Sequence, residues 1–382
     1  MIQMNNFQFY LPARIVFEKG VLSKIGEFVS QFGKRCLLMT GKNFARMHGY
    51  TDYILEKLSD YELQAYLFEE VEPNPTKETV LMAVDTFLNN ECEVIIAFGG
   101  GSVIDAAKVV ALISRLGGKI EDYFFPNIVE KEIYPVIAIP TTCGTGSEAT
   151  RYAVITDNDD GLKKTISGDP LIPRIAILDV NNLKYISKEV FSSTSADVFC
   201  HAIESFVNIK YTHFSDLFAK EAIKFAFENV VEAYAGNEDS KERMLYASLL
   251  AGVAINFSGS TAVHALGYYL TSKHGIPHGL ASAVFLLPVL EYEKDNILDR
   301  IHELAYAMRL KQKDPEHFIN ALRQKFDEID IARSLSDLGI GYEEKKRLIN
   351  EALLFRRNLD NNPMKLEEKD LTKIVEVAYI GR

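Results

Sequence analysis

Residues 91–116 read ECEVIIAFGGGSVIDAAKVVALISRL and decide the fold of the first half of the chain. The apolar run up to Phe98 predicts a buried strand, the three glycines predict a tight turn, and the stretch from Ser102 onward has helical periodicity. Consecutive glycines let the backbone approach a ligand closely, and the amides at the helix start can bind a phosphate or pyrophosphate. A tight strand–helix turn that binds no ligand, and needs glycine only for its backbone geometry, explains the same three glycines equally well. Ser102 and Asp105 have the S-x-x-D spacing of a capping box.

Three further apolar strands are predicted, at RCLLMTG (35–41), IYPVIAIPTT (133–142) and RIAILD (174–179). Helical stretches lie between the strands, among them TKETVLMAVDTFLNN (76–90). Strands that are apolar throughout and alternate with helices indicate a parallel sheet covered on both faces. We therefore expect a doubly wound α/β domain over residues 1–183.

The character of the chain changes after about residue 183. Four stretches with helical periodicity follow, without a convincing strand: SDLFAKEAIKFAFENVVEAY (215–234), SKERMLYASLLAGVAINFS (240–258), DRIHELAYAMRL (299–310) and PEHFINALRQKFDEI (315–329). We predict an all-helical domain over residues 184–382.

The composition argues against several classes of protein. The 42 basic and 53 acidic residues give a net charge of −11 over 382 residues, which disfavours nucleic acid or an anionic membrane as a partner. The N-terminus lacks the basic start and apolar core of a signal peptide, and no apolar run approaches the roughly 20 residues that span a bilayer. The four cysteines are widely spaced and indicate reduced thiols in a cytoplasmic protein.

A second loop rich in glycine and hydroxyl groups, PTTCGTGSEATRY (140–152), follows the strand at 133–142. Alone it fits a polar surface loop, but two such loops after neighbouring strands favour a dinucleotide at the carboxyl end of the sheet. The turn after the first predicted strand contains Gly41 and Lys42, and no carboxylate that would bind an adenosine ribose. Lys42 can pair with a 2′-phosphate, which favours NADP(H) over NAD(H). If Lys42 is only a solvated surface lysine, both cofactors bind.

Four residues are candidate ligands of one divalent metal: Asp197, His201, His264 and His278. The first two are four residues apart in a stretch with helical character, so their side chains lie on one helix face. Three imidazoles and one carboxylate suit Fe(II), Zn(II), Co(II) or Mn(II), and such a metal usually acts as a Lewis acid. Taken singly, His264 also fits a hydrogen-bonded core residue and His278 a loop residue.

Together these pieces resemble the iron-containing (group III) alcohol dehydrogenase family over most of the chain. Seven motifs in the same order carry the resemblance: VEPNPT (71–76), GGGSVIDAAK (99–108), PTTCGTGSE (140–148), DPLIPRIAILD (169–179), SADVFCHAIESFV (195–207), STAVHALGYYLTSKHGIPHG (260–279) and NNPMKLEEKDL (361–371). The resemblance implies a Rossmann-like domain, an all-helical domain, an Fe(II) site in the cleft, and reversible oxidation of a primary alcohol or diol with NAD(P). It also implies a small-molecule substrate and a homodimer or larger homo-oligomer, for which QFYLPARIVF (8–17) is a candidate strand.

The resemblance assigns roles to individual residues. The four metal ligands of the family are all present, and zinc is expected to substitute for iron. The cofactor residues that it implies are Gly41, Lys42, Asn74, Gly99, Gly100, Gly101, Ser102, Thr141, Thr142, Thr150 and Lys164. Gly41 stands where NAD-preferring members have an aspartate, which agrees with the preference for NADP(H) inferred above.

One position departs from the family pattern. Many members have a second histidine four residues after the third metal ligand, proposed to relay a proton, and this chain has Tyr268 there. A relay then requires Tyr268, the nearby His274, or water and cofactor hydroxyls. A phenol with a pKa near ~10 is a poor general base unless a metal or a cation lowers it.

Three other functions remain open from the sequence. A lyase of the dehydroquinate synthase type requires additional Lys and Arg for a phosphorylated acid, and the single arginine of 183–290, Arg243, disfavours it. A hydroxyacid dehydrogenase of the 4-hydroxybutyrate type requires a cation for the substrate carboxylate, for which Arg151 or Lys273 would serve. If the protein were a non-catalytic metal or nucleotide binder, there would be no reason for a metal site and a dinucleotide site to occur in one chain.

Overall fold

The computed structural model describes residues 6–381, and their contacts divide them into two compact units. The α/β unit consists of Tyr10–Thr142 and Gly146–Ile186, and the helical unit consists of residues 6–9, Cys143–Thr145 and residues 187–381. The sequence predicts one division at 183/184, whereas the contacts also assign two short segments of the first half to the helical unit.

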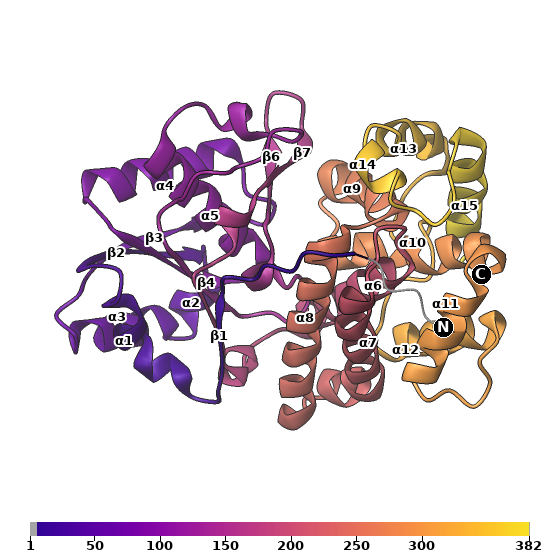
Figure 1. Cartoon of the computed structure of the whole chain (residues 1–382), viewed down its shortest axis with the longest axis horizontal. Coiled ribbons are helices and arrows are strands. Elements are labelled where there is room, and N and C mark those ends of the chain that lie inside the picture. The colour runs from indigo at the N-terminus through magenta and orange to yellow at the C-terminus, as the bar shows by residue number, and fades with distance from the viewer. Residues whose placement is uncertain (1–5, 382) are drawn as a thin grey trace. The chain divides into compact units, whose positions relative to one another are not determined.

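A six-stranded parallel sheet forms the centre of the α/β unit (Figure 1). Its strands are ordered β1-β8-β5-β4-β2-β3, and every pairing is parallel. Their bounds are β1 Arg14–Phe17, β2 Arg35–Gly41, β3 Gln64–Val71, β4 Val94–Gly99, β5 Val136–Pro140 and β8 Ile175–Leu178. Each of the four strands predicted from the sequence contains one of these, and the predicted fold class is confirmed.

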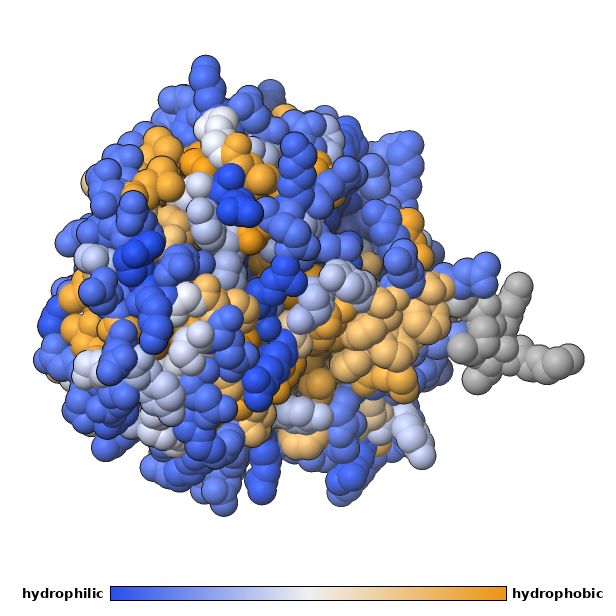
Figure 2. Space-filling model, turned by 60° about the vertical axis from the view of Figure 1, so that its left-hand side comes forward, coloured by the Kyte–Doolittle hydropathy of each residue, from blue (hydrophilic) through white to orange (hydrophobic). Residues whose placement is uncertain are grey.

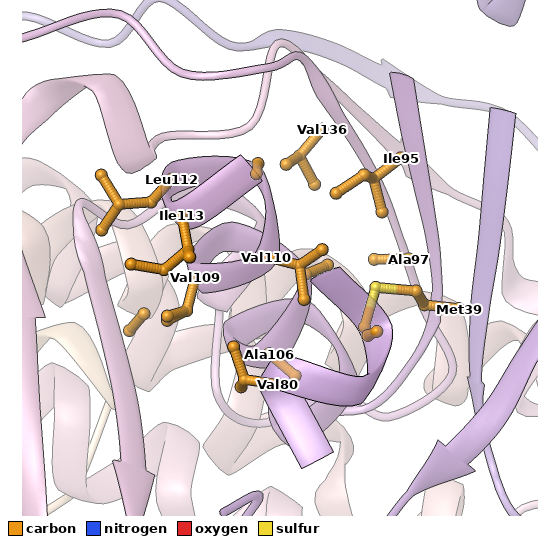
Figure 3. Close-up of a cluster of buried hydrophobic side chains, with 14 of the residues drawn as sticks. Met39, Val80, Ile95, Ala97, Ala106, Val109, Val110, Leu112, Ile113 and Val136 are labelled. Carbon is orange, nitrogen blue, oxygen red and sulfur yellow. The ribbon is translucent and has the colours of Figure 1, made fainter. Parts of the chain in front are cut away.

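Helices cover both faces of this sheet. They are α1 Ile25–Val29, α2 Phe44–Met47, α3 Tyr50–Ser59, α4 Lys77–Asn89 and α5 Gly101–Leu116. Side chains alternate along each strand, so that Met39 and Ile95 join one apolar cluster with α4 and α5 (Figure 3). Leu38 and Ile96 point the other way, into a cluster with α1 and α3. The four inner strands β2, β4, β5 and β8 are largely apolar because both faces are covered.

The sequence places β1 within the candidate strand at 8–17, but it does not reveal β3 or the antiparallel hairpin of β6 (Tyr152–Asp157) and β7 (Leu162–Ser167). β1 and β3 are the edge strands of the sheet, and partly exposed residues interrupt their apolar pattern. The hairpin is polar along much of its length, so it has no continuous apolar run. β1 lies in the segment expected to pair between subunits, and in this chain it pairs with β8.

The order of the strands reverses at β2. The chain runs from β2 outward to β3 and then returns past β2 to β4, so the carboxyl ends of β2 and β4 are neighbours. Thr40 is in register with Phe98, which brings Gly41 and Gly99 to adjacent positions. Open α/β sheets bind ligands at such a reversal, outside the carboxyl ends of the strands.

The second half, over residues 187–381, consists of helices and the loops between them, as the sequence predicts (Figure 1). The helices are α6 Lys188–Val207, α7 His213–Tyr234, α8 Glu238–Ser258, α9 Ala262–His274, α10 His278–Glu293, α11 Leu298–Ala307, α12 Pro315–Glu328, α13 Lys345–Ala352, α14 Arg356–Leu359 and α15 Glu368–Ile380. Side chains satisfy the first amides of several of them: the Ser187 hydroxyl accepts from the amide of Val190 at 3.2 Å.

Within residues 6–381 no single helix is long and apolar enough to cross a membrane. Helices α8 and α9 taken together have sufficient length and apolar composition, but they are bent by 109° at their junction. Length and composition are the only criteria that this pair meets. The face of the molecule in Figure 2 is mostly hydrophilic, with one continuous apolar area on its right-hand side and smaller apolar areas among the charged side chains. All four cysteines are buried free thiols.

Ile95 tests the packing of the sheet against α5. Its side chain is fully buried, so Ile95→Ala is expected to lower the free energy of unfolding by about 2–5 kcal/mol through lost burial and a residual cavity. Leu88→Ala on α4 is the control, because Leu88 is 49% exposed and its loss should cost about 0.5 kcal/mol or less. Urea denaturation followed by circular dichroism measures both, and equal losses would contradict the assigned core.

Candidate metal centre and dinucleotide site

The structure brings the four predicted metal ligands together in the helical unit. Asp197 and His201 lie one turn apart on α6, His264 lies in the first turn of α9, and His278 is the first residue of α10. One donor atom from each lies within 4.8 Å of those of the other three. His201 Nε2 and His264 Nε2 lie 3.6 Å and 3.8 Å from Asp197 Oδ1. Three separate helices thus direct nitrogen and oxygen donors to one point.

The chemistry of this cluster fits a divalent metal ion. Asp197 is 1% exposed, and among the described residues nothing donates a hydrogen bond to either of its carboxylate oxygens. A buried carboxylate in that state is costly, and a coordinated cation removes the cost. Burial lowers the pKa of His201 against the opposing effect of Asp197, which favours the neutral imidazole that a metal binds.

A close approach of α10 to α6 sets the position of His278. A Cβ atom on Gly279 would lie 1.9 Å from the carbonyl oxygen of Ser193 and 3.0 Å from Cβ of Asp197, so only glycine permits this packing. The amide of Leu280 donates to the Ser193 hydroxyl at 3.1 Å, which ties the first turn of α10 to α6. The sequence motif IPHG therefore combines a ligand with the glycine that places it.

Glu204 belongs to the centre and is missing from the sequence prediction. It is 1% exposed, and its Oε2 is hydrogen-bonded to Nδ1 of His264. Its Oε1 accepts from the amide and the hydroxyl of Thr261, each at 2.7 Å. Burial acts to raise the pKa of Glu204, but His264 and Thr261 outweigh it and hold that pKa below its usual value. Its spacing of seven residues from Asp197, on one helix face, is a signal in the sequence that could have identified it.

The two residues considered for a proton relay have different surroundings. The Tyr268 ring lies 6.3 Å from that of His264 and 6.0 Å from that of His278, between centroids. Burial raises the pKa of Tyr268 to about 12, which keeps the phenol protonated near neutral pH. His274 Nε2 is 2.8 Å from Glu344 Oε2, and this pair is partly exposed to solvent. Tyr268 thus contacts the ligand cluster, whereas His274 pairs with an acid outside it.

The glycine turn of the α/β unit follows β4 directly. A Cβ atom on Gly99 would lie 2.5 Å from Cγ2 of Val103, so the turn requires glycine there. Helix α5 begins at Gly101 with Gly100 as its N-cap, and no side chain caps it. The predicted capping box of Ser102 and Asp105 is therefore wrong, because the helix begins one residue earlier than Ser102. The uncapped amides of this 16-residue helix point to an anion at its start.

Several predicted cofactor residues surround this turn. The Asn74 amide donates to the Ser102 hydroxyl at 3.3 Å, and Asn74 has a φ of 58°. The Thr141 amide donates to the Gly99 carbonyl at 3.0 Å, and Thr142 lies against Gly100. Together with Gly41 at the end of β2, these residues gather at the carboxyl edge of the sheet.

Three other predicted cofactor residues differ in their surroundings. Lys42 is exposed, one residue beyond the end of β2. Lys164 lies on β7, where its ammonium pairs with Asp160. Thr150 is 5% exposed, and its hydroxyl accepts from the ammonium of Lys108 at 3.2 Å. The structure therefore leaves direct contact of Thr150 and Lys164 with a cofactor as a prediction.

The fold is shared with solved alcohol dehydrogenases. The structure of an alcohol dehydrogenase from Oenococcus oeni matches with a TM-score of 0.93 at 29% identity, over 98% of this chain and 100% of that one. An NADPH-dependent butanol dehydrogenase of Clostridium saccharobutylicum is 30% identical over 386 residues, 98% of each protein. An NAD-dependent methanol dehydrogenase of Bacillus methanolicus is 29% identical over 97% of this chain and 99% of that protein.

Two family models match consecutive parts of the chain. The model described as iron-containing alcohol dehydrogenase matches residues 12–180, and the C-terminal model of the Fe-containing alcohol dehydrogenase family matches residues 191–379. The chain therefore belongs to the iron-containing alcohol dehydrogenase family, and it is an oxidoreductase.

Glu204→Gln tests the hydrogen bond that orients His264. The substitution keeps the shape of the side chain but removes the charge that favours the Nδ1–H tautomer, so metal affinity should fall about 10- to 100-fold. Competition with a chromogenic chelator measures the dissociation constant for Zn(II). Glu344→Gln is the matched control, since it changes the same kind of Glu–His pair at His274. Unchanged affinity in Glu204→Gln would show that Glu204 does not orient the ligand.

Proposed function

We propose that the protein is a metal-dependent, NAD(P)-linked dehydrogenase that interconverts a primary alcohol or diol and the corresponding aldehyde. The observation that carries this proposal is the buried Asp197 carboxylate, which accepts no hydrogen bond from residues 6–381 and lies among three imidazoles. We propose Fe(II) as the ion, with Zn(II) as a substitute. Held by these residues, the ion supplies a Lewis acid that lowers the pKa of an alcohol and polarises an aldehyde carbonyl.

The α/β unit supplies the residues expected to hold the nicotinamide dinucleotide. The uncapped start of α5 and the close-packed glycines of the turn before it suit the pyrophosphate. At the neighbouring strand end, Gly41 presents no carboxylate to repel a 2′-phosphate, and the exposed Lys42 follows it. These features support NADP(H) as the preferred cofactor. The relatives named above include both an NADPH-dependent and an NAD-dependent enzyme.

The charges near the candidate sites support an uncharged substrate. Arg151 pairs with Asp169 at 3.1 Å, and Lys273 lies 4.0 Å from Glu351. The hydroxyacid alternative requires a cation, for which either of these residues would serve, and each already has an acidic partner in the chain. An alcohol or aldehyde without a carboxylate needs no cation to bind it.

We further propose that the enzyme acts as a homodimer in the cytoplasm. β1 is an edge strand of the parallel sheet, and an edge strand is a place where a strand of a second chain can pair. The four buried free cysteines support a reducing compartment.

Turnover with aldehydes tests the proposed activity. The chain, loaded anaerobically with Fe(II), should oxidise NADPH in the presence of short aldehydes and semialdehydes, followed at 340 nm. His278→Ala should abolish most of this turnover, because one of the four metal ligands is lost. Absence of turnover with every aldehyde, in protein shown to retain its metal, would exclude the dehydrogenase.

Lys42→Ala tests the cofactor preference. Loss of one charge-assisted bond to a 2′-phosphate should raise the KM for NADPH about tenfold and leave the KM for NADH unchanged. Lys34→Ala is the matched control, since Lys34 is an exposed lysine just before the opposite end of the same strand. Equal effects on the two cofactors would contradict a role for Lys42 in 2′-phosphate binding.

A further inference from the structure

The motif NNPMKLEEKDL (361–371) carries part of the family resemblance, but it contains none of the metal ligands or expected cofactor residues. Its first two residues, Asn361 and Asn362, follow helix α14 and are 1% and 4% exposed. A buried asparagine amide needs partners for both its oxygen and its nitrogen. Both side chains reach the segment 260–262, which leads into α9, the helix that carries His264.

Side-chain amides hold the backbone of the loop between α8 and α9. Nδ2 of Asn361 donates to the Ser260 carbonyl at 2.9 Å. Nδ2 of Asn208 donates to the carbonyls of Ser258 and Gly259 at 3.1 Å and 2.9 Å. Gly259 has a φ of 77°, and a Cβ atom there would lie 2.9 Å from Nδ2 of Asn361, so the loop requires glycine at this position. Buried carbonyls need donors, and here side chains from two other segments supply them.

The same asparagines connect this loop to the end of α6. Asn208 is the residue that follows α6. The backbone carbonyl of Asn361 accepts from the amide of Ile209 at 3.0 Å. Because α6 carries Asp197 and His201, the loop before α9 is attached to the helix that presents two of the four candidate ligands.

Asn362 satisfies the first amide of α9. The helix begins at Ala262, and the side chain of its N-cap residue, Thr261, makes no capping bond. The Ala262 amide donates instead to Oδ1 of Asn362 at 2.8 Å, across 100 positions of the chain. Glu204 accepts from the Thr261 amide at 2.7 Å. Two side chains from elsewhere in the helical unit therefore hold the first turn of α9, on which His264 lies.

Glu293, the last residue of α10, fixes the orientation of the Asn362 amide. Its Oε1 accepts from Nδ2 of Asn362 at 2.6 Å, which leaves Oδ1 of Asn362 for the Ala262 amide. Glu293 is 1% exposed, and burial together with the charge of Glu204 raises its pKa to about 8. The neutral carboxyl still accepts a hydrogen bond, so it holds Asn362 without adding a second negative charge near Glu204.

We propose that Asn362 is a positioning residue of the metal centre, which fixes the first turn of α9 and thereby places His264 opposite Asp197. The inference rests on the proposed metal-dependent function. Asn362 acts through the backbone of α9 and not by coordinating the ion. Without its side chain the buried Ala262 amide loses its acceptor, and the turn that carries His264 loses one of the two bonds that hold its start.

Asn229 offers a matched control for a buried asparagine that only stabilises the fold. It is 6% exposed and lies on α7, a helix without a candidate metal ligand. Its Nδ2 donates to the Phe225 carbonyl at 2.8 Å, and its Oδ1 accepts from Arg243 at 3.2 Å. The same substitution at Asn362 and Asn229 therefore removes a buried amide with partners on both of its polar atoms.

The test compares Asn362→Ala with Asn229→Ala in the full chain. Chelator competition measures the dissociation constant for Zn(II), the visible spectrum of the Co(II)-loaded protein reports the ligand geometry, and urea unfolding of the metal-free chain is followed in parallel. Asn362→Ala should weaken Zn(II) binding about tenfold, as expected for a residue that supports a ligand, and should alter the Co(II) bands. Asn229→Ala should keep the wild-type spectrum and change the affinity less than about twofold. A purely structural role would lower the free energy of unfolding without altering the spectrum of the folded protein.

Two variants of Glu293 test the same bond from its other side, and they decide the question if Asn362→Ala does not fold. Glu293→Gln keeps an acceptor for Nδ2 of Asn362, so it should retain the wild-type affinity for Zn(II) and the wild-type Co(II) spectrum. Glu293→Leu leaves Nδ2 without an acceptor and should weaken Zn(II) binding about 3- to 10-fold.

The outcomes separate this inference from the proposed function. Wild-type affinity and spectrum in Asn362→Ala, or equal losses of affinity in the two asparagine variants, would overturn the positioning role and leave the metal-dependent dehydrogenase intact. Equal affinities in Glu293→Gln and Glu293→Leu would also overturn it. A wild-type chain that binds neither Zn(II) nor Co(II) would overturn the proposed function and this inference together.

Discussion

The buried charge of Asp197 is the constraint on which the helical unit depends. A carboxylate with 1% exposure and no hydrogen-bond donor among the described residues is unstable unless a cation meets it. The surrounding helices are arranged to make that possible: α9 and α10 each present an imidazole to the carboxylate, and Gly279 lets α10 begin in contact with α6. Glu204, on the same face of α6, then holds His264 by its other nitrogen. The centre is thus a connected set of bonds between helices and not four isolated ligands.

The α/β unit is organised by a different constraint, namely that parallel strands end at one edge. Because the order reverses at β2, the turns after β2 and β4 lie beside each other, and the glycine turn leaves the start of α5 open to an anion. The loops around this edge have little regular structure of their own. Ser102 bonds the loop at Asn74, while Asp105 and Lys108 bond residues at the start of β6.

The elements that the sequence reveals are those whose pattern has a local physical origin. β2, β4, β5 and β8 were predictable because both faces of the sheet are covered, so each strand contains a nearly continuous apolar run. The β6–β7 hairpin was not, since its side chains are mixed and its position depends on bonds to α4 and α5. The capping box at Ser102 failed because the spacing of two side chains does not say where a helix begins, and Asp105 instead bonds residues 49 positions away.

The sequence by itself determined the classes of element, the parallel sheet, the glycine turn and the four residues of the candidate metal site. These follow from local periodicity and from residue types that few other chemistries require. Only the tertiary structure decided which distant residues support them. Glu204 meets His264 across 60 positions, and Lys108 meets Tyr152 across 44. No local pattern encodes such pairs, because each depends on how two separate segments cross, and that crossing is set by the packing of the whole unit.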